Sequence, residues 1–176
     1  MNILNGNGIR FTEAKMIKVY FDGCCEPVNP GGTAAYGVAI YNDFQRIWEE
    51  SRVFVPKAGR ERETSNNVAE YSGFIAALDW LLKEKLENES IQVYGDSMLV
   101  LCQMLMDDPT YGIRWKIKKG LYKPLAHKAL RLLKKFPNIR GQWIPREENS
   151  IADELSKAEL IKRGVQFKIQ PEEGKL

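Results

Sequence analysis

Four acidic residues stand where the chain passes from one predicted element to the next. They are Asp22, Glu70, Asp96 and Asp153. Carboxylate oxygens are the ligands that hard divalent cations such as Mg²⁺ prefer in proteins. If the fold gathers these side chains, they form an all-oxygen cage. The sequence therefore predicts a metal-dependent site that hydrolyses phosphodiester bonds.

Each acid also has an ordinary structural explanation. Asp22 with Gly23 could form a turn after a strand, Asp96 could cap a helix, and Asp153 could favour the positive end of a helix dipole. Glu70 could be a solvated residue at the edge of an apolar helix face. In an open sheet, however, ligands gather beyond the carboxyl ends of central strands, near helix starts. Four carboxylates crowded there would repel one another unless cations compensate.

Hydrophobic patterning predicts nine elements in the order β-β-β-α-β-α-α-β-α. Predicted strands cover residues 16–22, 33–41, 45–55, 91–95 and 139–144. Helices are predicted from Asn66, after a cap at Asp96 or Ser97, over residues 125–136, and from Ser150, where Asp153 completes an apparent capping box. This order predicts an α/β fold with a mixed five-stranded sheet, three strands antiparallel and then two parallel, flanked by helices.

Composition indicates one globular domain. The 176 residues contain 44% hydrophobic and 28% charged residues, and we expect a domain over residues 16–164 with extensions at 1–15 and 165–176. We find neither a membrane-length apolar run nor a secretory signal. Three cysteines, two of them adjacent, do not suit a disulfide framework, and a single histidine disfavours zinc. We therefore expect a cytoplasmic monomer.

Positive charge is concentrated in one segment. Residues 113–135 contain nine basic residues and no acid, which leaves 17 basic against 23 acidic residues elsewhere. Such asymmetry indicates a polyanion-binding face beside an acidic body. A solvated, lysine-rich helix face is the alternative.

Four strings of the sequence resemble type 1 ribonuclease H in order and spacing. They are FDGCCEPVNPGGTAAYGVAIY, TSNNVAEYSGFIAAL, VYGDSMLVLCQM and WIPREENSIADELSK. The likeness spans about residues 16–160. It implies a ribonuclease H-like fold and an endonuclease that cleaves the RNA strand of RNA–DNA hybrids, leaving 3′-hydroxyl and 5′-phosphate ends.

The resemblance also implies roles for the four acids. Asp22 would contact two Mg²⁺ ions, with Mn²⁺ able to substitute. Glu70 and Asp96 would complete one metal site, with Glu70 also near the scissile 2′-hydroxyl, and Asp153 would help to hold the other ion. Two-metal chemistry needs little general-base assistance from side chains, which suits a chain with one histidine.

A further implication concerns the 2′-hydroxyl group, which distinguishes RNA from DNA. Asn66, Asn67 and Asn29 fall where the family places amide side chains, and an amide can both donate to and accept from a hydroxyl. Ser65 and the backbone at Gly23 would hold phosphates, fixing register without reading sequence.

The chain departs from many relatives in two places. The loop before the last helix carries no histidine and resembles a Pro-Arg-Glu-x-Asn subgroup, in which Arg146 and Asn149 would contact substrate. The stretch WKIKKGLYKP resembles members without a separate basic protrusion. Trp115 and Lys116 would there contact the DNA strand, although Trp115 could equally belong to the core. The sole histidine, His127, is expected to be structural or solvated.

Two other functions remain open at this point. A non-catalytic nucleic-acid-binding module of the same fold is one, although binding alone gains nothing from acids that face phosphates. A nuclease that also cuts double-stranded RNA, or a domain once attached to a reverse transcriptase, is the other, because one scaffold hosts several substrates.

Overall fold

The computed structural model describes residues 16–168. Its elements, in chain order, are β1 (Met16–Glu26), β2 (Thr33–Asn42), β3 (Gln45–Val53), α1 (Asn66–Lys83), β4 (Ser90–Gly95), α2 (Met98–Met104), α3 (Lys123–Leu133), β5 (Ile139–Trp143), the 3₁₀ turn η1 (Arg146–Asn149) and α4 (Ser150–Lys162). The strands form one sheet in the order β3-β2-β1-β4-β5. The β1–β2 and β2–β3 pairs are antiparallel, whereas β4 pairs in parallel with β1 and β5. The predicted fold class is confirmed.

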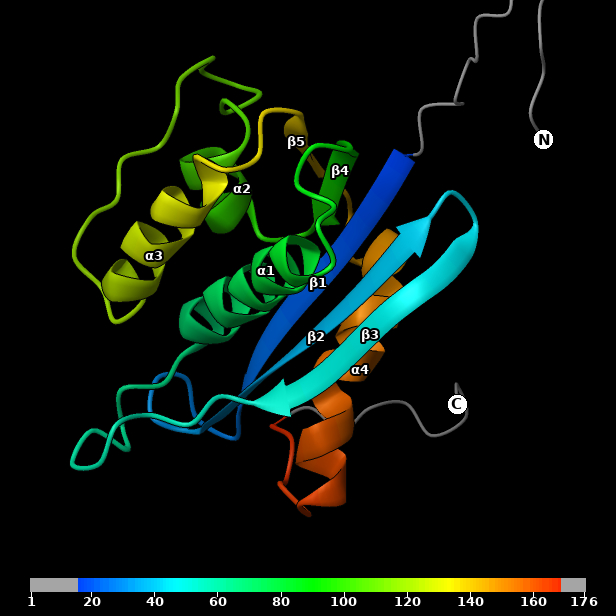
Figure 1. Ribbon diagram of the computed structural model, residues 1–176. Coiled ribbons are helices and arrows are strands. Elements are labelled where there is room, and N and C mark those ends of the chain that lie inside the picture. The colour runs from blue at the N-terminus through cyan, green and yellow to red at the C-terminus, as the bar shows by residue number, and fades with distance from the viewer. Residues whose placement is uncertain (1–15, 169–176) are drawn as a thin grey trace, which may run out of the picture.

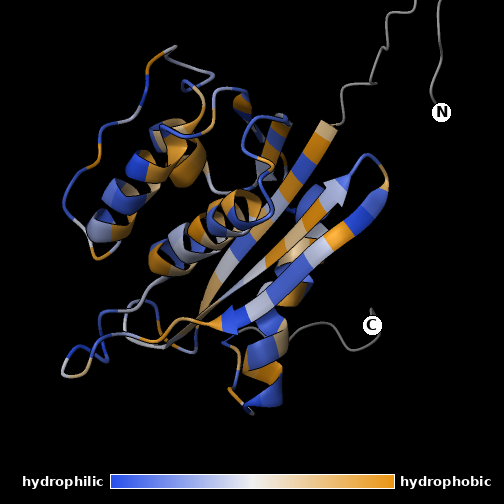
Figure 2. Ribbon diagram, in the orientation of Figure 1, coloured by the Kyte–Doolittle hydropathy of each residue, from blue (hydrophilic) through white to orange (hydrophobic). Residues whose placement is uncertain are grey.

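Helices cover both faces of this sheet. Helix α1 packs on β1 and β2 and is flanked by α3, while α4 crosses the opposite face against β2, β1 and β3 (Figure 1). Figure 2 shows apolar residues concentrated where α1 meets the sheet, with polar residues on the outer side of α3. The main core lies in this α1-side layer and includes Phe21, Phe74 and Leu101, all fully buried.

Strand β1 is longer than predicted. Its alternating residues Ile17, Val19 and Phe21 are buried. Parallel pairing with β4 stops at Tyr20, but antiparallel pairing with β2 continues to Glu26. The prediction that the strand ends at Asp22 was therefore wrong. Asp22 instead lies just beyond the last residue paired with β4, where the parallel half of the sheet opens.

Other element boundaries differ modestly from the predictions. Strand β3 ends at Val53, while α3 covers residues 123–133 with Pro124 in its first turn. Ser97 occupies the N-cap of α2 but makes no side-chain capping bond. The predicted capping box was also wrong, because η1 precedes α4 and Asn149, not Ser150, occupies the N-cap position.

Two glycines allow the helices to approach the sheet backbone on either side of Asp22. A Cβ atom at Gly23 would lie 2.2 Å from the backbone nitrogen of Glu70 in α1. A Cβ atom at Gly37 in β2 would lie 2.4 Å from the carbonyl oxygen of Ala152 in α4. Both distances are too short for any larger residue. The absence of these side chains therefore brings α1 and α4 within reach of Asp22.

The predicted extensions are only partly described. Residues 1–15 and 169–176 lie outside the described residues. At the start of the predicted C-terminal tail, Val165 and Phe167 pack beside Cys24 and Leu160, and the backbone N–H of Lys168 donates to a carboxylate oxygen of Glu26. Within residues 16–168, no helix is both long and apolar enough to cross a lipid bilayer.

Candidate active site

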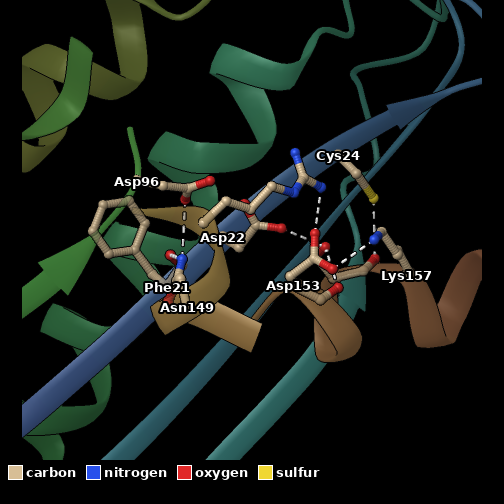
Figure 3. Close-up of polar contacts among 9 residues, drawn as sticks. Phe21, Asp22, Cys24, Asp96, Asn149, Asp153 and Lys157 are labelled. Atoms are coloured by element: carbon tan, nitrogen blue, oxygen red, sulfur yellow. Dashed lines mark hydrogen bonds and ion pairs between the residues drawn. The ribbon is translucent and has the colours of Figure 1, made fainter. Parts of the chain in front are cut away.

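Three of the four predicted acids meet at one end of the sheet. Asp22 comes from β1, Glu70 from the second turn of α1, and Asp96 from the residue after β4. One carboxylate oxygen from each of these residues lies within 4.8 Å of the other two. Figure 3 shows Asp22 and Asp96 close together, with Asp153 on the other side of Asp22. The carboxyl end of the parallel strands thus gathers the acids as the sequence predicted.

Asp22 is the central carboxylate of this group. It is 3% exposed, and the Ser156 hydroxyl donates to its Oδ2 atom over 2.7 Å. Burial raises the pKa of Asp22 to about 6, and the negative charges of Asp96 and Asp153 add to the rise, while the Ser156 hydroxyl opposes it. The protein alone therefore disfavours the charged form of this carboxylate.

Glu70 is also a buried carboxylate whose charged form is disfavoured. It is 8% exposed at the side of α1 that faces β1. Burial, followed by the charges of Asp22 and Asp96, raises its pKa well above the ordinary value for glutamate. Two adjacent, buried carboxylates that resist ionisation are typical of a functional site rather than of a packed core.

The donor atoms fit a hard divalent cation. The Oε2 atom of Glu70 is buried and has no hydrogen-bond partner among the described residues. A buried oxygen of this kind needs an explanation, because burying an unpaired polar atom costs free energy. A cation at the carboxylate cluster would pair with this oxygen and compensate the repulsion among the three acids. Mg²⁺ suits such a set because all the ligands are oxygen.

Asn149 is buried beside the carboxylate cluster. It is 1% exposed, and its amide nitrogen donates to the Phe21 carbonyl oxygen (2.9 Å) and to Asp96 Oδ1 (3.0 Å). The amide nitrogen is thus bonded within the protein, and the predicted contact of Asn149 with substrate remains a prediction. Its position at the start of α4 lets it fix the Asp96 carboxylate relative to β1 (Figure 3).

Asp153 stands apart from the three-carboxylate cluster. It accepts from the Arg146 guanidinium and from Lys157 Nζ, the latter over 2.5 Å. Its charge still influences Asp22, whose pKa it raises. The predicted metal-binding role of Asp153 remains a prediction. The predicted phosphate-contacting residue Arg146 here pairs with an acid of the site, and its side chain is 60% exposed.

Sequence reasoning missed two residues of α4 that contact these acids. Ser156 lies 2.7 Å from Asp22 Oδ2 and 2.8 Å from the Asp153 carbonyl oxygen. Lys157 could have been found, because it follows Asp153 by four residues, the spacing at which helical side chains pair. Ser156 offered a weaker signal, a small polar residue on the buried side of a predicted helix.

The amide residues predicted to read RNA gather at the start of α1. Asn66 and Asn67 are exposed in its first turn. The Asn29 side-chain oxygen accepts from the backbone N–H of Asn66 over 3.0 Å, which links the β1–β2 loop to the helix. Ser65 caps α1 by accepting from the N–H of Val68. The structure thus places Asn29, Asn66 and Asn67 on one surface.

The remaining predicted substrate residues lie in different settings. Gly23 is buried and packs against the backbone of Glu70, and the predicted phosphate contact of its backbone remains a prediction. Trp115 is half-buried and its indole N–H donates to Asp108 Oδ2 over 2.6 Å, whereas Lys116 is exposed. His127 is exposed on α3. Burial raises the pKa of the Cys24 thiol to about 12, which disfavours its reactive thiolate form.

Comparison with known sequences identifies relatives of this chain. A family model described as reverse transcriptase-like matches residues 20–159. The bifunctional protein Rv2228c of Mycobacterium tuberculosis is 36% identical over 129 residues, which are 73% of this chain and 31% of that protein. The chain thus spans about a third of the length of this curated relative.

Solved structures extend the comparison. The N-terminal RNase H domain of Rv2228c, determined as a fusion with maltose-binding protein, is 31% identical with a TM-score of 0.65, covering 81% of this chain and 97% of that one. LC11-RNase H1 in complex with an RNA/DNA hybrid is 31% identical with a TM-score of 0.68, covering 84% and 98%. The sheet order, the carboxylate cluster and these matches agree. The chain is an RNase H-like domain and belongs to the ribonuclease H family.

Proposed function

We propose that this protein is a type 1 ribonuclease H, an endonuclease that hydrolyses the RNA strand of RNA–DNA hybrids with two divalent ions. The observation that carries the proposal is the cluster of Asp22, Glu70 and Asp96, with a buried Glu70 oxygen that has no hydrogen-bond partner within residues 16–168. A non-catalytic binding module would gain nothing from such a cluster. The hybrid bound to LC11-RNase H1 supports the substrate class.

Each residue of the site would have its own role in catalysis. Asp22, Glu70 and Asp96 would hold one ion, and Asp22 with Asp153 the other. When bound, these ions would activate water and stabilise the leaving oxygen. The Ser156 hydroxyl orients the Asp22 carboxylate. The chain thus supplies preorganised ligands, and the products would carry 3′-hydroxyl and 5′-phosphate ends.

Substrate discrimination would come from the exposed amides at the start of α1. Replacing Asn66 and Asn67 by Ala should lower kcat/KM on a hybrid by about tenfold, the order expected for two lost hydrogen bonds to 2′-hydroxyls. The preference for hybrid over DNA duplex in binding should fall by a similar factor. Both are measured with one sequence prepared as hybrid and as DNA.

A matched control is Asn88→Ala, which removes an exposed amide from the loop before β4. It should leave cleavage and preference at the wild-type level. An unchanged hybrid preference in the Asn66 and Asn67 double variant would contradict the assigned role of these amides.

Affinity would come largely from the basic segment before α3. Lys116, Lys118 and Lys119 are exposed there. Changing all three to Gln should weaken binding to hybrids of any sequence, because each phosphate contact releases counterions. The slope of log K against log salt should become shallower by roughly two to three.

The control for net charge is a triple variant of Lys83, Lys85 and Arg163, which are exposed at or just after the C-terminal ends of α1 and α4. It removes the same charge and should change the slope little. Equal slopes for the two triple variants would show that the basic segment is a solvated face and not a binding surface.

The reaction itself is tested by the ends of the products. Cleavage of a hybrid should leave RNA fragments that a 5′-phosphate-dependent exonuclease degrades and that a polymerase extends from their 3′-hydroxyls. Fragments with 2′,3′-cyclic phosphate ends would contradict the proposed hydrolysis.

A further inference from the structure

The connection between α2 and α3, residues 105–122, is long and contains neither helix nor strand. Connections of this length inside a compact domain are uncommon and usually functional. This one carries Trp115 and Lys116, and it borders a hollow of about 510 Å³ whose lining includes Gln103, Trp115, Lys116 and Tyr122. We refer to residues 105–122 as the α2–α3 segment.

Gln103, in the last turn of α2, is a polar residue buried in the core. It is 5% exposed, so its amide would cost free energy if it lacked hydrogen bonds. Its Oε1 atom accepts from the Tyr71 hydroxyl over 2.6 Å. Its Nε2 atom donates to the Lys116 carbonyl oxygen (3.0 Å) and to the Tyr122 hydroxyl (3.4 Å). One side chain thus joins α1 to the middle and the end of the α2–α3 segment.

Asp108 stabilises the same segment from within. It is 5% exposed, and its Oδ1 atom accepts from the backbone N–H groups of Thr110 and Tyr111. Its Oδ2 atom accepts from the Trp115 indole. The Trp115 backbone N–H also donates to the Cys102 carbonyl oxygen over 2.9 Å. Trp115 is therefore fixed at both its backbone and its ring.

The hydrogen-bonded chain from Tyr71 through Gln103 to Lys116 begins next to the carboxylate cluster. Tyr71 directly follows Glu70 in α1 and is fully buried, and its ring stacks on that of Tyr122 with centroids 5.4 Å apart. The residue that holds the α2–α3 segment is thus bonded to the helix that carries a proposed metal ligand.

We propose that Gln103 is a positioning residue for substrate binding: it holds Trp115 and Lys116 at a fixed separation from Glu70. The inference rests on the proposed function, because the separation matters only if both places contact one nucleic acid. Gln103 itself touches no reacting group. Its loss therefore affects capture of the substrate more than the chemical step.

The test is Gln103→Met, which keeps the length and apolar volume of the side chain but removes its hydrogen bonds. KM for a hybrid should rise about tenfold while kcat changes by less than about twofold, because the cost falls on binding. Exchange of the Trp115 amide and indole hydrogens, followed by NMR, should accelerate by about tenfold or more as the segment loosens. Met104→Leu, a neighbouring buried substitution, controls for changes in the core.

Tyr71→Phe provides a second and milder test, since it removes only the hydroxyl that Gln103 accepts from. It should also raise KM and accelerate exchange of the Trp115 hydrogens, each by a smaller factor than Gln103→Met does. The proposal would be overturned if Gln103→Met changed neither KM nor the exchange rates of the Trp115 hydrogens. It would also be overturned if Gln103→Met and Met104→Leu lowered kcat and raised KM to the same extent. If the wild-type protein cleaves no hybrid, the proposed function fails instead, and the Trp115 exchange rates still decide whether Gln103 holds the segment.

Discussion

Asp22→Asn should abolish cleavage of an RNA–DNA hybrid, with a loss of at least about a thousandfold in kcat, corresponding to roughly 4 kcal/mol. The carboxylate lies between the Glu70–Asp96 pair and Asp153, so it is the ligand that both proposed ions share. Binding should persist or tighten, because one negative charge facing the phosphates is removed. Single-turnover cleavage and titration of the hybrid measure the two quantities separately.

A suitable control is Asp79→Asn, which removes an exposed carboxylate of α1 that pairs with Lys128. That variant should cleave at the wild-type rate. Turnover retained in Asp22→Asn would remove the basis of the proposed metal site, whereas loss of binding as well as cleavage would indicate that the substitution damages the fold.

The same carboxylate should make the metal-free protein more stable in weak acid than at neutral pH. The pKa of Asp22 lies at about 6 in the folded state against an ordinary value of 3.8, which corresponds to about 3 kcal/mol. A raised folded pKa stabilises the protein fully below the unfolded value, and this contribution is lost as pH rises through 6. Glu70 shifts in the same direction.

The difference between wild type and Asp22→Asn isolates this contribution. In EDTA, urea unfolding should give the variant and the wild type nearly equal free energies of unfolding at about pH 4. At about pH 7.5 the free energy of unfolding of the variant should be higher by up to about 3 kcal/mol. Saturating Mg²⁺ should stabilise the wild type at neutral pH more than the variant, since it binds only the folded state. If the difference in unfolding free energy between wild type and Asp22→Asn does not change with pH, the assigned environment of Asp22 is contradicted.

The overall fold could be predicted because its strongest signals are local. The alternation in β1 and the three- and four-residue spacing of apolar residues in α1 each specify an element and its buried face. The end of β1 could not be predicted in this way. Residues 23–26 continue the strand only because β2 pairs with them, and that pairing depends on the chain returning through the β1–β2 loop.

The carboxylate cluster was predicted because the acids share one property, their position near the open end of the sheet. Most of the contacts around the acids were not predictable from spacing. Asn149 is turned inward to Phe21 and Asp96, although the sequence around it looks like an exposed loop. Asp153 binds Arg146 and Lys157 because η1 and α4 place both cations beside it. The partners of Asn149 depend on packing between elements distant in sequence, and the Arg146 contact depends on the η1 turn, whereas the spacing of Lys157 from Asp153 is a local signal.

The central claim is metal-dependent cleavage of RNA within a hybrid. The most direct measurement presents one sequence as RNA–DNA hybrid, RNA duplex, DNA duplex and single-stranded RNA, each with Mg²⁺, with Mn²⁺ or with EDTA. We predict cleavage of the RNA strand of the hybrid in the presence of either ion and none in EDTA. Hybrid that is bound but left uncut with both ions would contradict the account and identify the protein as a binding module.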